Sequence, residues 1–272
     1  MPEITFRHLE CALAMLIIMV AVAMGAPPFT CPLHTAIKFG NPDGGHVRTF
    51  GNSKFVLSYD GSKRTARWVA EYLPPGKPAH KEPRHNVFRP DPSVPREFRS
   101  MLSDYFLSNY DRGHLAPAAD HAYARDAMDA TFLLSNMVPQ DKTLNRGLWA
   151  DLEAWCRDQA RSANGTWVFT GPAFMPADAP AQDIRKPDLA VTYRVIGPNH
   201  VAVPTHLWKT ILIQGVNAPA VRSFLVPNAA PPDGKRFIDY AVDTDFLEHW
   251  VGLDFWSELP DDVETALEGD YP

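Results

Sequence analysis

Two short segments between residues 110 and 157 contain the side chains best suited to acid–base or metal chemistry. In the first, Arg112, Gly113 and His114 occupy consecutive positions after a turn-prone stretch. A neutral imidazole can take a proton from water, and a guanidinium can neutralise an anion. One histidine alone would mean little, because most histidines have structural or surface roles. In an extended backbone, however, Arg112 and His114 project from the same face, which favours a general base beside an anion-binding cation.

The second segment places four functional side chains at a regular interval. Asn145, Trp149, Glu153 and Arg157 follow one another four residues apart. In a helix this spacing arranges them around one broad face. The alternative is an ordinary amphipathic helix with Asn145 as a cap, Trp149 in the core, and Glu153 and Arg157 as an i,i+4 ion pair. For this segment taken alone, the amphipathic helix is the simpler interpretation.

Length and composition predict one folded domain. The chain has 272 residues, of which 45% are hydrophobic and 21% are charged, enough to bury one sizeable core. Its formal net charge of −6 argues against broad electrostatic adhesion to a polyanion. Any contact with nucleic acid must therefore use a local cluster of arginine and lysine.

Residues 1–25 have the pattern of a signal peptide. An apolar run, Cys11–Ala26, follows Arg7, and Ala23 and Gly25 are the small residues that a signal peptidase reads. A short membrane anchor is the weaker alternative, because this run falls short of the roughly 20 residues that a spanning helix needs. We expect cleavage after Gly25, or after Ala23, and a secreted or periplasmic protein without stable membrane association.

Residues 26–272 are expected to form a single domain that retains two cysteines. Cys31 and Cys156 would lie in a compartment where disulfides persist. A disulfide between them and two separate thiols are both open, since a chain of this length does not need the link to fold.

The pattern of elements predicts an α+β fold with a central antiparallel sheet and flanking helices. Residues 54–59 and 66–73 read as a hairpin around a turn, and residues 74–97 as a long surface loop with a functional role. Further strands are expected at 166–170, 190–196 and 210–213, and helices at 126–134 and 144–161.

Together, the two segments resemble the DNA/RNA non-specific endonuclease family, whose fold contains a ββα-metal motif. The matching residues are Asp111–His114, the segment Thr131–Gln140, and Asn145, Trp149 and Glu153 at the family's spacing. Four fixed residues alone would arise by chance in roughly one such chain in several hundred, and the spaced residues make the match more specific. The resemblance extends to residues 55–73, 203–209 and 224–228 and so covers most of the chain.

This resemblance implies a sugar-nonspecific endonuclease that hydrolyses phosphodiester bonds in DNA and RNA. His114, at the end of a strand, would be the general base. Asn145, at the start of the next helix, would be the single protein ligand of Mg²⁺, with Mn²⁺ as an alternative. Because Mg²⁺ keeps several of its waters, Glu153 would hold metal-bound water rather than contact the ion.

The resemblance also assigns arginines to the substrate. Arg112 would neutralise charge that develops on the phosphate, and Arg157 would hold either Glu153 or a neighbouring phosphate. Arg84 is the candidate for the family's upstream phosphate-binding arginine. Arg89 is an equally good candidate, because no motif fixes the spacing of this loop.

Some residues are expected to be structural. Asp111 and Asn136 would bond to the backbone around His114. His80 and His85 would lie at the surface, because no further ligand stands at metal-site spacing. The carboxylates at 261–270 lack the alternating order of a calcium-binding loop, which favours a solvated acidic end.

Two other classes of function compete with this assignment. A phosphatase or esterase is disfavoured, because the chain has no Gly-x-Ser-x-Gly sequence and no dense cluster of metal-binding His and Asp residues. A non-catalytic nucleic-acid or protein-binding module on the same fold is the second alternative. The presence of both His114 and Asn145 favours the enzyme.

Overall fold

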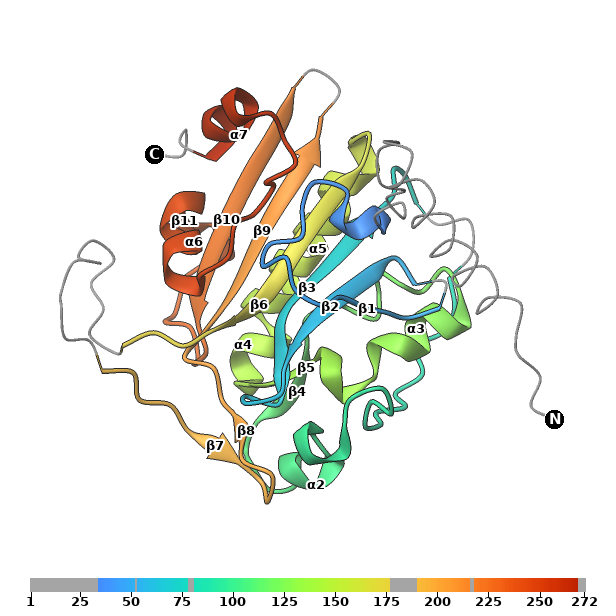
Figure 1. Ribbon diagram of the computed structural model, residues 1–272, viewed down its shortest axis with the longest axis vertical. Helices are drawn as coiled ribbons and strands as arrows, with labels where there is room; N and C mark the ends of the chain where they lie inside the picture. Colours follow the sequence, from blue (N-terminus) through green and yellow to red (C-terminus); the bar gives the residue numbers. More distant parts are fainter. Residues whose placement is uncertain (1–33, 52, 78–80, 177–189, 216–217, 269–272) are drawn as a thin grey trace, which may run out of the picture. The chain divides into compact units, whose positions relative to one another are not determined.

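An antiparallel sheet of seven strands forms the centre of the fold (Figure 1). The computed structural model describes residues 34–51, 53–77, 81–176, 190–215 and 218–268, and all of these except His34 belong to one compact unit, Thr35–Pro272. The spatial order of the strands is β1 (Arg48–Thr49), β2 (Phe55–Asp60), β3 (Thr65–Leu73), β6 (Thr166–Ala173), β9 (His206–Gln214), β10 (Pro219–Pro227) and β11 (Ala241–Val242). Every neighbouring pair is antiparallel.

The predicted hairpin is formed by β2 and β3. Phe55 lies opposite Glu71 in their register. The turn is held by the carboxylate of Asp60, which accepts hydrogen bonds from the backbone N–H groups of Ser62 at 2.8 Å and Lys63 at 3.2 Å. Such side-chain bonds to nearby backbone are typical of Asp in turns.

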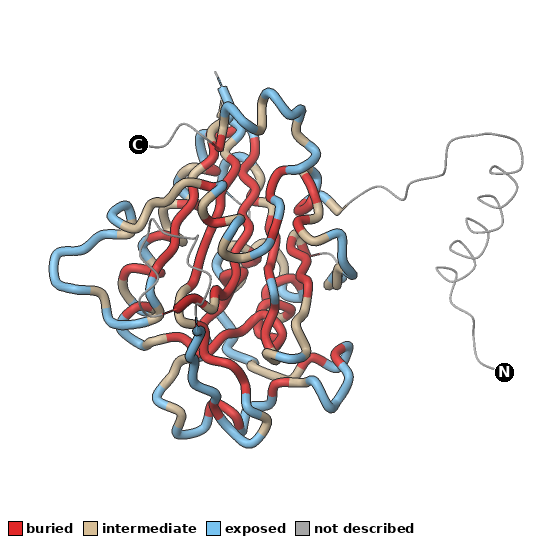
Figure 2. The backbone as a smooth tube through the Cα atoms, turned by 60° about the vertical axis from the view of Figure 1, so that its left-hand side comes forward, coloured by how far each residue is buried: buried red, intermediate tan, exposed pale blue. Residues whose placement is uncertain are grey.

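Alternate residues of the central strands face two separate apolar layers, so the sheet is buried on both sides. On β3, Val69 belongs to one layer and Trp68 to the other. Helix α5 (Leu148–Ser162) closes the first layer with Leu152 among its buried residues. The second layer is closed by η1 (Thr35–Ile37), α6 (Thr244–Val251), α7 (Asp261–Glu268) and the segment around the buried Trp256. Figure 2 shows that the buried residues, coloured red, lie mainly along the extended segments of the sheet.

Shorter elements lie at one end of the sheet (Figure 1). A two-stranded sheet consists of β4 (Asp111–His114) and β5 (Met137–Gln140), and α4 (Lys142–Arg146) follows it. A second two-stranded sheet consists of β7 (Val195–Ile196) and β8 (Val201–Ala202). The remaining elements are η2 (Arg96–Phe98), α2 (Leu102–Tyr105), α3 (Arg125–Thr131), η3 (Leu134–Asn136) and η4 (Phe237–Tyr240). This architecture confirms the predicted α+β class.

The structure corrects two predicted elements. The helix expected at 144–161 is two helices, because Gly147 adopts φ −115° and ψ −107°, which are not helical values. The strand expected at 190–196 is reduced to β7, and residues 190–195 are exposed. An apolar alternation stabilises a strand only when one of its faces is covered, and no residue of this run before Ile196 is buried.

Candidate active site

The candidate site is built on β4, β5 and α4, the ββα arrangement that the sequence predicts. His114 ends β4 and lies opposite Met137 of β5. Asp141 caps α4, since its carboxylate accepts hydrogen bonds from the backbone N–H groups of Thr143 at 2.8 Å and Leu144 at 3.0 Å. His114 and the start of α4 are thereby held on adjacent elements.

Two residues fix the backbone around His114. At Gly113, an added Cβ would lie 2.0 Å from Oε1 of Gln140, so only glycine fits between the strands. Asn136 accepts a hydrogen bond from the backbone N–H of Ala116 and donates to the carbonyls of Ala116 and Thr131, all at 2.9 Å. Asn136 therefore has the backbone-bonding role that the sequence predicts.

A pocket of about 510 Å³ brings together five of the six predicted site residues. Arg84, Arg112, His114, Asn145 and Glu153 all line it. The long loop before β4 thus contributes to the site, as its length predicts. Arg89 points elsewhere. Its guanidinium donates to the carbonyl of Asp129 at 2.9 Å, so the geometry favours Arg84 over Arg89 as the upstream arginine.

His114 is neutral at physiological pH. It is 9% exposed, and burial together with the charges of Arg84 and Arg112 lowers its pKa from 6.5 to about 3. Its Nε2 is enclosed and makes no hydrogen bond within the described residues. Nδ1 is therefore the ring nitrogen that can meet a water molecule in the pocket.

An aromatic wall, Phe88 and Phe132, supports the histidine and the two arginines. The His114 ring packs edge-on to Phe132 at 5.0 Å and lies 5.7 Å from Phe88. The guanidinium of Arg112 lies 4.3 Å from the centre of Phe88, and that of Arg84 lies 5.4 Å from the centre of Phe132. Cation–π contacts hold both charges toward the pocket. No spacing in the sequence identifies these two phenylalanines.

Asn145 is oriented by an acidic partner. Its Nδ2 donates to Oδ2 of Asp111 at 2.9 Å, which leaves the carboxamide oxygen as the atom that can ligate an ion. The guanidinium of Arg146 also binds both oxygens of Asp111, each at 2.9 Å. Burial raises the pKa of Asp111, but these hydrogen bonds outweigh it and lower the pKa below its ordinary value. Asp111 thus bonds to side chains, whereas the sequence prediction had it bonding to backbone.

Glu153 and Arg157 do not form the i,i+4 pair considered from the sequence. The guanidinium of Arg157 donates to Oδ1 of Asp120 at 2.8 Å, and the Asp120 side chain is 1% exposed. Arg157 is absent from the pocket lining. Glu153 lines the pocket, and burial raises its pKa to about 7. The structure therefore directs Arg157 toward a buried carboxylate.

Behind the pocket lies a group of buried polar residues that the sequence did not reveal. Nε2 of His121 lies 3.2 Å from Oε2 of Glu71, and both side chains are at most 2% exposed. The amine of Lys209, in a residue that is 1% exposed, donates to Oγ1 of Thr170 at 2.6 Å. These residues are spread between positions 71 and 209, so only the fold brings them together.

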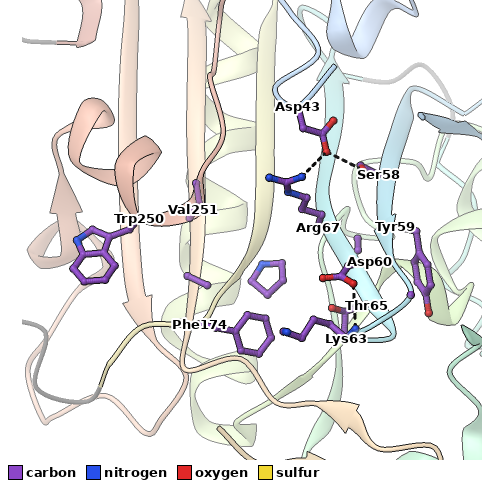
Figure 3. A pocket seen from close by; sticks show the side chains of 14 residues that line it. Asp43, Ser58, Tyr59, Asp60, Lys63, Thr65, Arg67, Phe174, Trp250 and Val251 are labelled. Atoms are coloured by element: carbon purple, nitrogen blue, oxygen red, sulfur yellow. Dashed lines mark hydrogen bonds and ion pairs between the residues drawn. The ribbon is translucent and has the colours of Figure 1, made fainter. Parts of the chain in front are cut away.

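A second pocket, of about 480 Å³, carries none of the predicted site residues (Figure 3). Its lining includes Asp43 and Arg67, which pair at 3.4 Å, and Lys63, whose amine lies over Phe174 at 5.3 Å. No histidine lines it. Its charged groups already have partners.

Three predictions outside the site have different outcomes. His85 is exposed and lies 3.6 Å from the carboxylate of Asp129, whereas His80 is outside the described residues. Cys156 is a buried free thiol, and Cys31 lies outside the described residues. The signal peptide predicted over residues 1–25 also lies outside them. In the part of the chain that is described, no helix is long and apolar enough to span a bilayer.

Known proteins share both the sequence and the fold. The chain is 41% identical over 226 residues to the nuclease EXOG, mitochondrial, of Danio rerio, which covers 82% of this chain and 64% of that protein. It is 39% identical over 228 residues to the endonuclease G, mitochondrial, of Caenorhabditis elegans, covering 82% of this chain and 72% of that protein. A solved EndoG/EndoGI complex matches with a TM-score of 0.74 and 33% identity over 86% of this chain and 95% of that chain. The chain thus spans less than two thirds of the length of the EXOG relative.

These relatives correct the expected location. The prediction of a secreted or periplasmic protein is wrong, because the relatives from vertebrates and yeast are named mitochondrial nucleases. An apolar run near the N-terminus indicates only that the segment prefers apolar surroundings. The compartment to which a protein is sent depends on the receptor that binds its targeting segment.

The sequence match extends over most of the described chain. Residues 34–262 match the DNA/RNA non-specific endonuclease family, a family of metal-dependent nucleases. The matched range contains β4, β5, α4 and α5, and with them every residue of the candidate pocket. The chain therefore belongs to the DNA/RNA non-specific endonuclease family.

Proposed function

We propose that this protein is a Mg²⁺-dependent endonuclease that hydrolyses phosphodiester bonds of DNA and RNA without reading base sequence. One observation carries the proposal. A single pocket gathers a neutral His114, the cations Arg84 and Arg112, and the oxygen donors Asn145 and Glu153. Contacts to phosphate and metal carry no base information, which supports cleavage of both nucleic acids.

The oxygen donors of the pocket fit a hard cation. The carboxamide oxygen of Asn145 is available because its Nδ2 is bound to Asp111, and the carboxylate of Glu153 lines the same pocket. Mg²⁺ prefers oxygen ligands and retains waters, which suits a site with few protein ligands. When bound there, Mg²⁺ would supply positive charge that stabilises the leaving 3′ oxygen. Mn²⁺ satisfies the same donors.

His114 would act through Nδ1. A water in the pocket would give its proton to this nitrogen while its oxygen attacks the phosphorus atom. Burial and the two arginines keep the imidazole neutral before substrate arrives. A bound phosphate would offset the charges of Arg84 and Arg112, so the imidazole would become more basic in the complex, when it must accept the proton.

The two arginines would bind the phosphate and Glu153 would order water. Arg84 and Arg112 are both exposed, and their stacking on Phe132 and Phe88 keeps their guanidinium groups beside the pocket. A guanidinium binds phosphate oxygens in pairs and retains its charge through the reaction. The Glu153 carboxylate would accept hydrogen bonds from waters next to Asn145.

Digestion of plasmid DNA and total RNA by the purified chain tests the proposal. We expect both substrates to be degraded with Mg²⁺ and neither with a chelator. Removing a general base lowers the rate roughly 10²–10⁴-fold, so the cleavage rate of His114→Ala should be at least about 100-fold below that of the wild type. His46→Ala, at an exposed position outside the pocket, is the matched control and should retain full activity.

The opposite result would favour the non-catalytic module. If the folded chain leaves both substrates intact with Mg²⁺ and with Mn²⁺, the enzyme assignment fails. If His114→Ala cleaves as fast as His46→Ala, hydrolysis uses a different base. The relatives' names also support a mitochondrial location, which fractionation of cells that express the full chain would check.

A further inference from the structure

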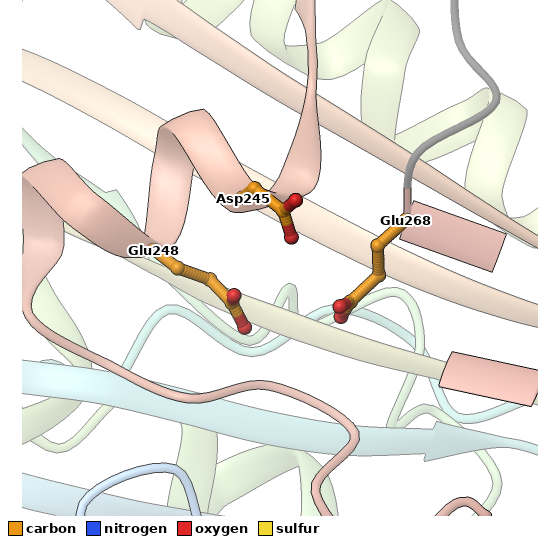
Figure 4. Close-up of side chains that lie close together, drawn as sticks. All are labelled: Asp245, Glu248 and Glu268. Atoms are coloured by element: carbon orange, nitrogen blue, oxygen red, sulfur yellow. The ribbon is translucent and has the colours of Figure 1, made fainter. Parts of the chain in front are cut away.

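Three carboxyl groups meet between the two C-terminal helices, on the sheet face opposite α5 (Figure 4). Asp245 and Glu248 are three residues apart on α6, so they project from one side of that helix. Glu268 comes from the end of α7. In Figure 4 the three side chains point toward one another, and one oxygen of each lies within 4.8 Å of the others. Residues distant in sequence thus share one small volume.

Glu268 is the buried member of the group. It is only 7% exposed, and its Oε1 is enclosed without a hydrogen-bond partner among the described residues. A buried carboxyl oxygen without a partner is costly. Oε1 of Glu248 accepts a hydrogen bond from the backbone N–H of Phe255 at 2.5 Å, which holds that side chain in place. The buried carboxyl group of Glu268, which keeps an unsatisfied oxygen, therefore points toward two further carboxylates.

The surroundings add negative charge. Burial and, after it, the negative charges of Glu248, Glu264, Asp245 and Asp254 together raise the pKa of Glu268 to about 9. Burial likewise raises the pKa of Glu248 to about 7. Glu268 also stands at the C-terminal end of α7, where the helix dipole disfavours an anion. If these carboxylates are ionised together, a positive charge is needed to offset their repulsion. The neighbouring charges that shift the pKa values of Glu248 and Glu268 are all carboxylates.

We propose that Asp245, Glu248 and Glu268 bind a Ca²⁺ ion that fastens α7 to α6. All the donors are carboxylate oxygens, which hard cations prefer. Two oxygens that share an ion at about 2.4 Å lie at most about 4.8 Å apart, so oxygens that all lie within 4.8 Å of one another can share one ion. Mg²⁺ requires shorter distances, of about 2.1 Å, and is usually held by one or two carboxylates. A site of three protein carboxylates therefore favours Ca²⁺.

Calcium binding to the purified full chain tests this site independently of nuclease activity. The measurements are Ca²⁺ stoichiometry by isothermal titration calorimetry and the melting temperature with and without Ca²⁺. The variants are Glu268→Gln and Asp245→Asn, and the second changes an exposed residue. Asp262→Asn is the matched control, because it removes an exposed carboxylate from the same helix outside the group. Asn145→Ala removes the proposed catalytic ligand.

The site predicts a specific pattern of results. At a Ca²⁺ concentration of about 100 times Kd, the melting temperature should rise by about 5–10 °C in the wild type, in Asp262→Asn and in Asn145→Ala. The rise should be lost in Glu268→Gln and at least halved in Asp245→Asn. The proposal is overturned if Asn145→Ala shows no Ca²⁺-dependent rise. It is also overturned if Glu268→Gln keeps the full rise, or if that variant melts higher than wild type in saturating Ca²⁺.

Discussion

Replacing Arg157 by alanine separates two roles for this side chain. The sequence resemblance places Arg157 on Glu153 or on a substrate phosphate, whereas the structure bonds it to Asp120 at 2.8 Å. The Asp120 side chain is 1% exposed and that of Arg157 is 28% exposed. A buried carboxylate that loses its partner destabilises the folded state or takes up a proton. Arg157→Ala should therefore reduce stability in a pH-dependent manner.

The size of the effect follows from the pKa of Asp120. Burial and Glu71 raise that pKa to about 6 even though Arg157 lowers it. Without the arginine the carboxyl of Asp120 stays protonated. The free energy of unfolding then falls, relative to the wild type, by about 1.4 kcal/mol for each pH unit above 6. The unpaired hydrogen-bonding group costs about 1 kcal/mol more. The free energy of unfolding of Arg157→Ala should therefore be lower than that of the wild type by about 1 kcal/mol at pH 6, about 2.5 kcal/mol at pH 7 and about 4 kcal/mol at pH 8.

The loss of stability grows with pH because the folded state of the variant binds a proton that the wild type releases. Because the pKa of Asp120 is raised in the folded state, its neutral carboxyl stabilises the fold fully when the pH is below the unfolded pKa near 3.9. That stabilisation is lost as the pH rises through the folded pKa. In the variant the folded pKa is higher still. Urea unfolding at pH 6, 7 and 8 measures the difference. Arg161→Ala, four residues later on α5 and half-exposed in a pair with Asp158, is the matched control and should change stability by less than about 1 kcal/mol. A loss that stays the same from pH 6 to pH 8, together with a raised KM for DNA, would refute this reasoning and favour a phosphate contact.

Three further predictions concern the pocket. Since the pKa of His114 is lowered to about 3, its imidazole should stay neutral down to pH 5, and an NMR titration of its ring protons that moves near pH 6.5 would contradict this. Gly113→Ala should lose at least about 3 kcal/mol of stability in urea unfolding, because the new Cβ would overlap Gln140 and must separate β4 from β5. Asp111→Ala removes the acceptor that orients Asn145, so the Mg²⁺ concentration for half-maximal cleavage should rise roughly 10–100-fold; an unchanged requirement would show that Asn145 needs no such support.

The parts of the site that could be predicted from sequence are local. His114 and Arg112 belong to one four-residue strand, and Asn145 and Glu153 belong to adjoining helices, so their spacing in the chain largely fixes their spacing in space. The β2–β3 hairpin could be predicted for the same reason, since Asp60 marks its turn. Short-range geometry of this kind follows from backbone periodicity and turn chemistry.

The remaining features depend on tertiary packing. The pairing of Arg157 with Asp120 spans 37 residues, and competes successfully with the local pairing to Glu153 that helical spacing allows. The break at Gly147 is another example, because the residues on both sides of it are helical and only Gly147 leaves the helical backbone angles. The choice of Arg84 over Arg89 depends on Phe132, which packs against the upstream loop from a distant segment. None of these outcomes follows from spacing along the chain.

The buried amine of Lys209 explains how the sheet positions both halves of the site. From β9 it donates to Oγ1 of Thr170 on β6 at 2.6 Å, and it reaches the carbonyl of Leu115, directly after His114, at 3.5 Å. The same amine lies 5.3 Å from the ring centre of Trp149, which is in the first turn of α5 just after Asn145. Because a buried amine is held firmly by the few groups that can satisfy it, Lys209 fixes the segment that carries His114 and the helix that follows Asn145 against the central sheet. The distance between His114 and Asn145 is therefore set by the central sheet as well as by the ββα motif.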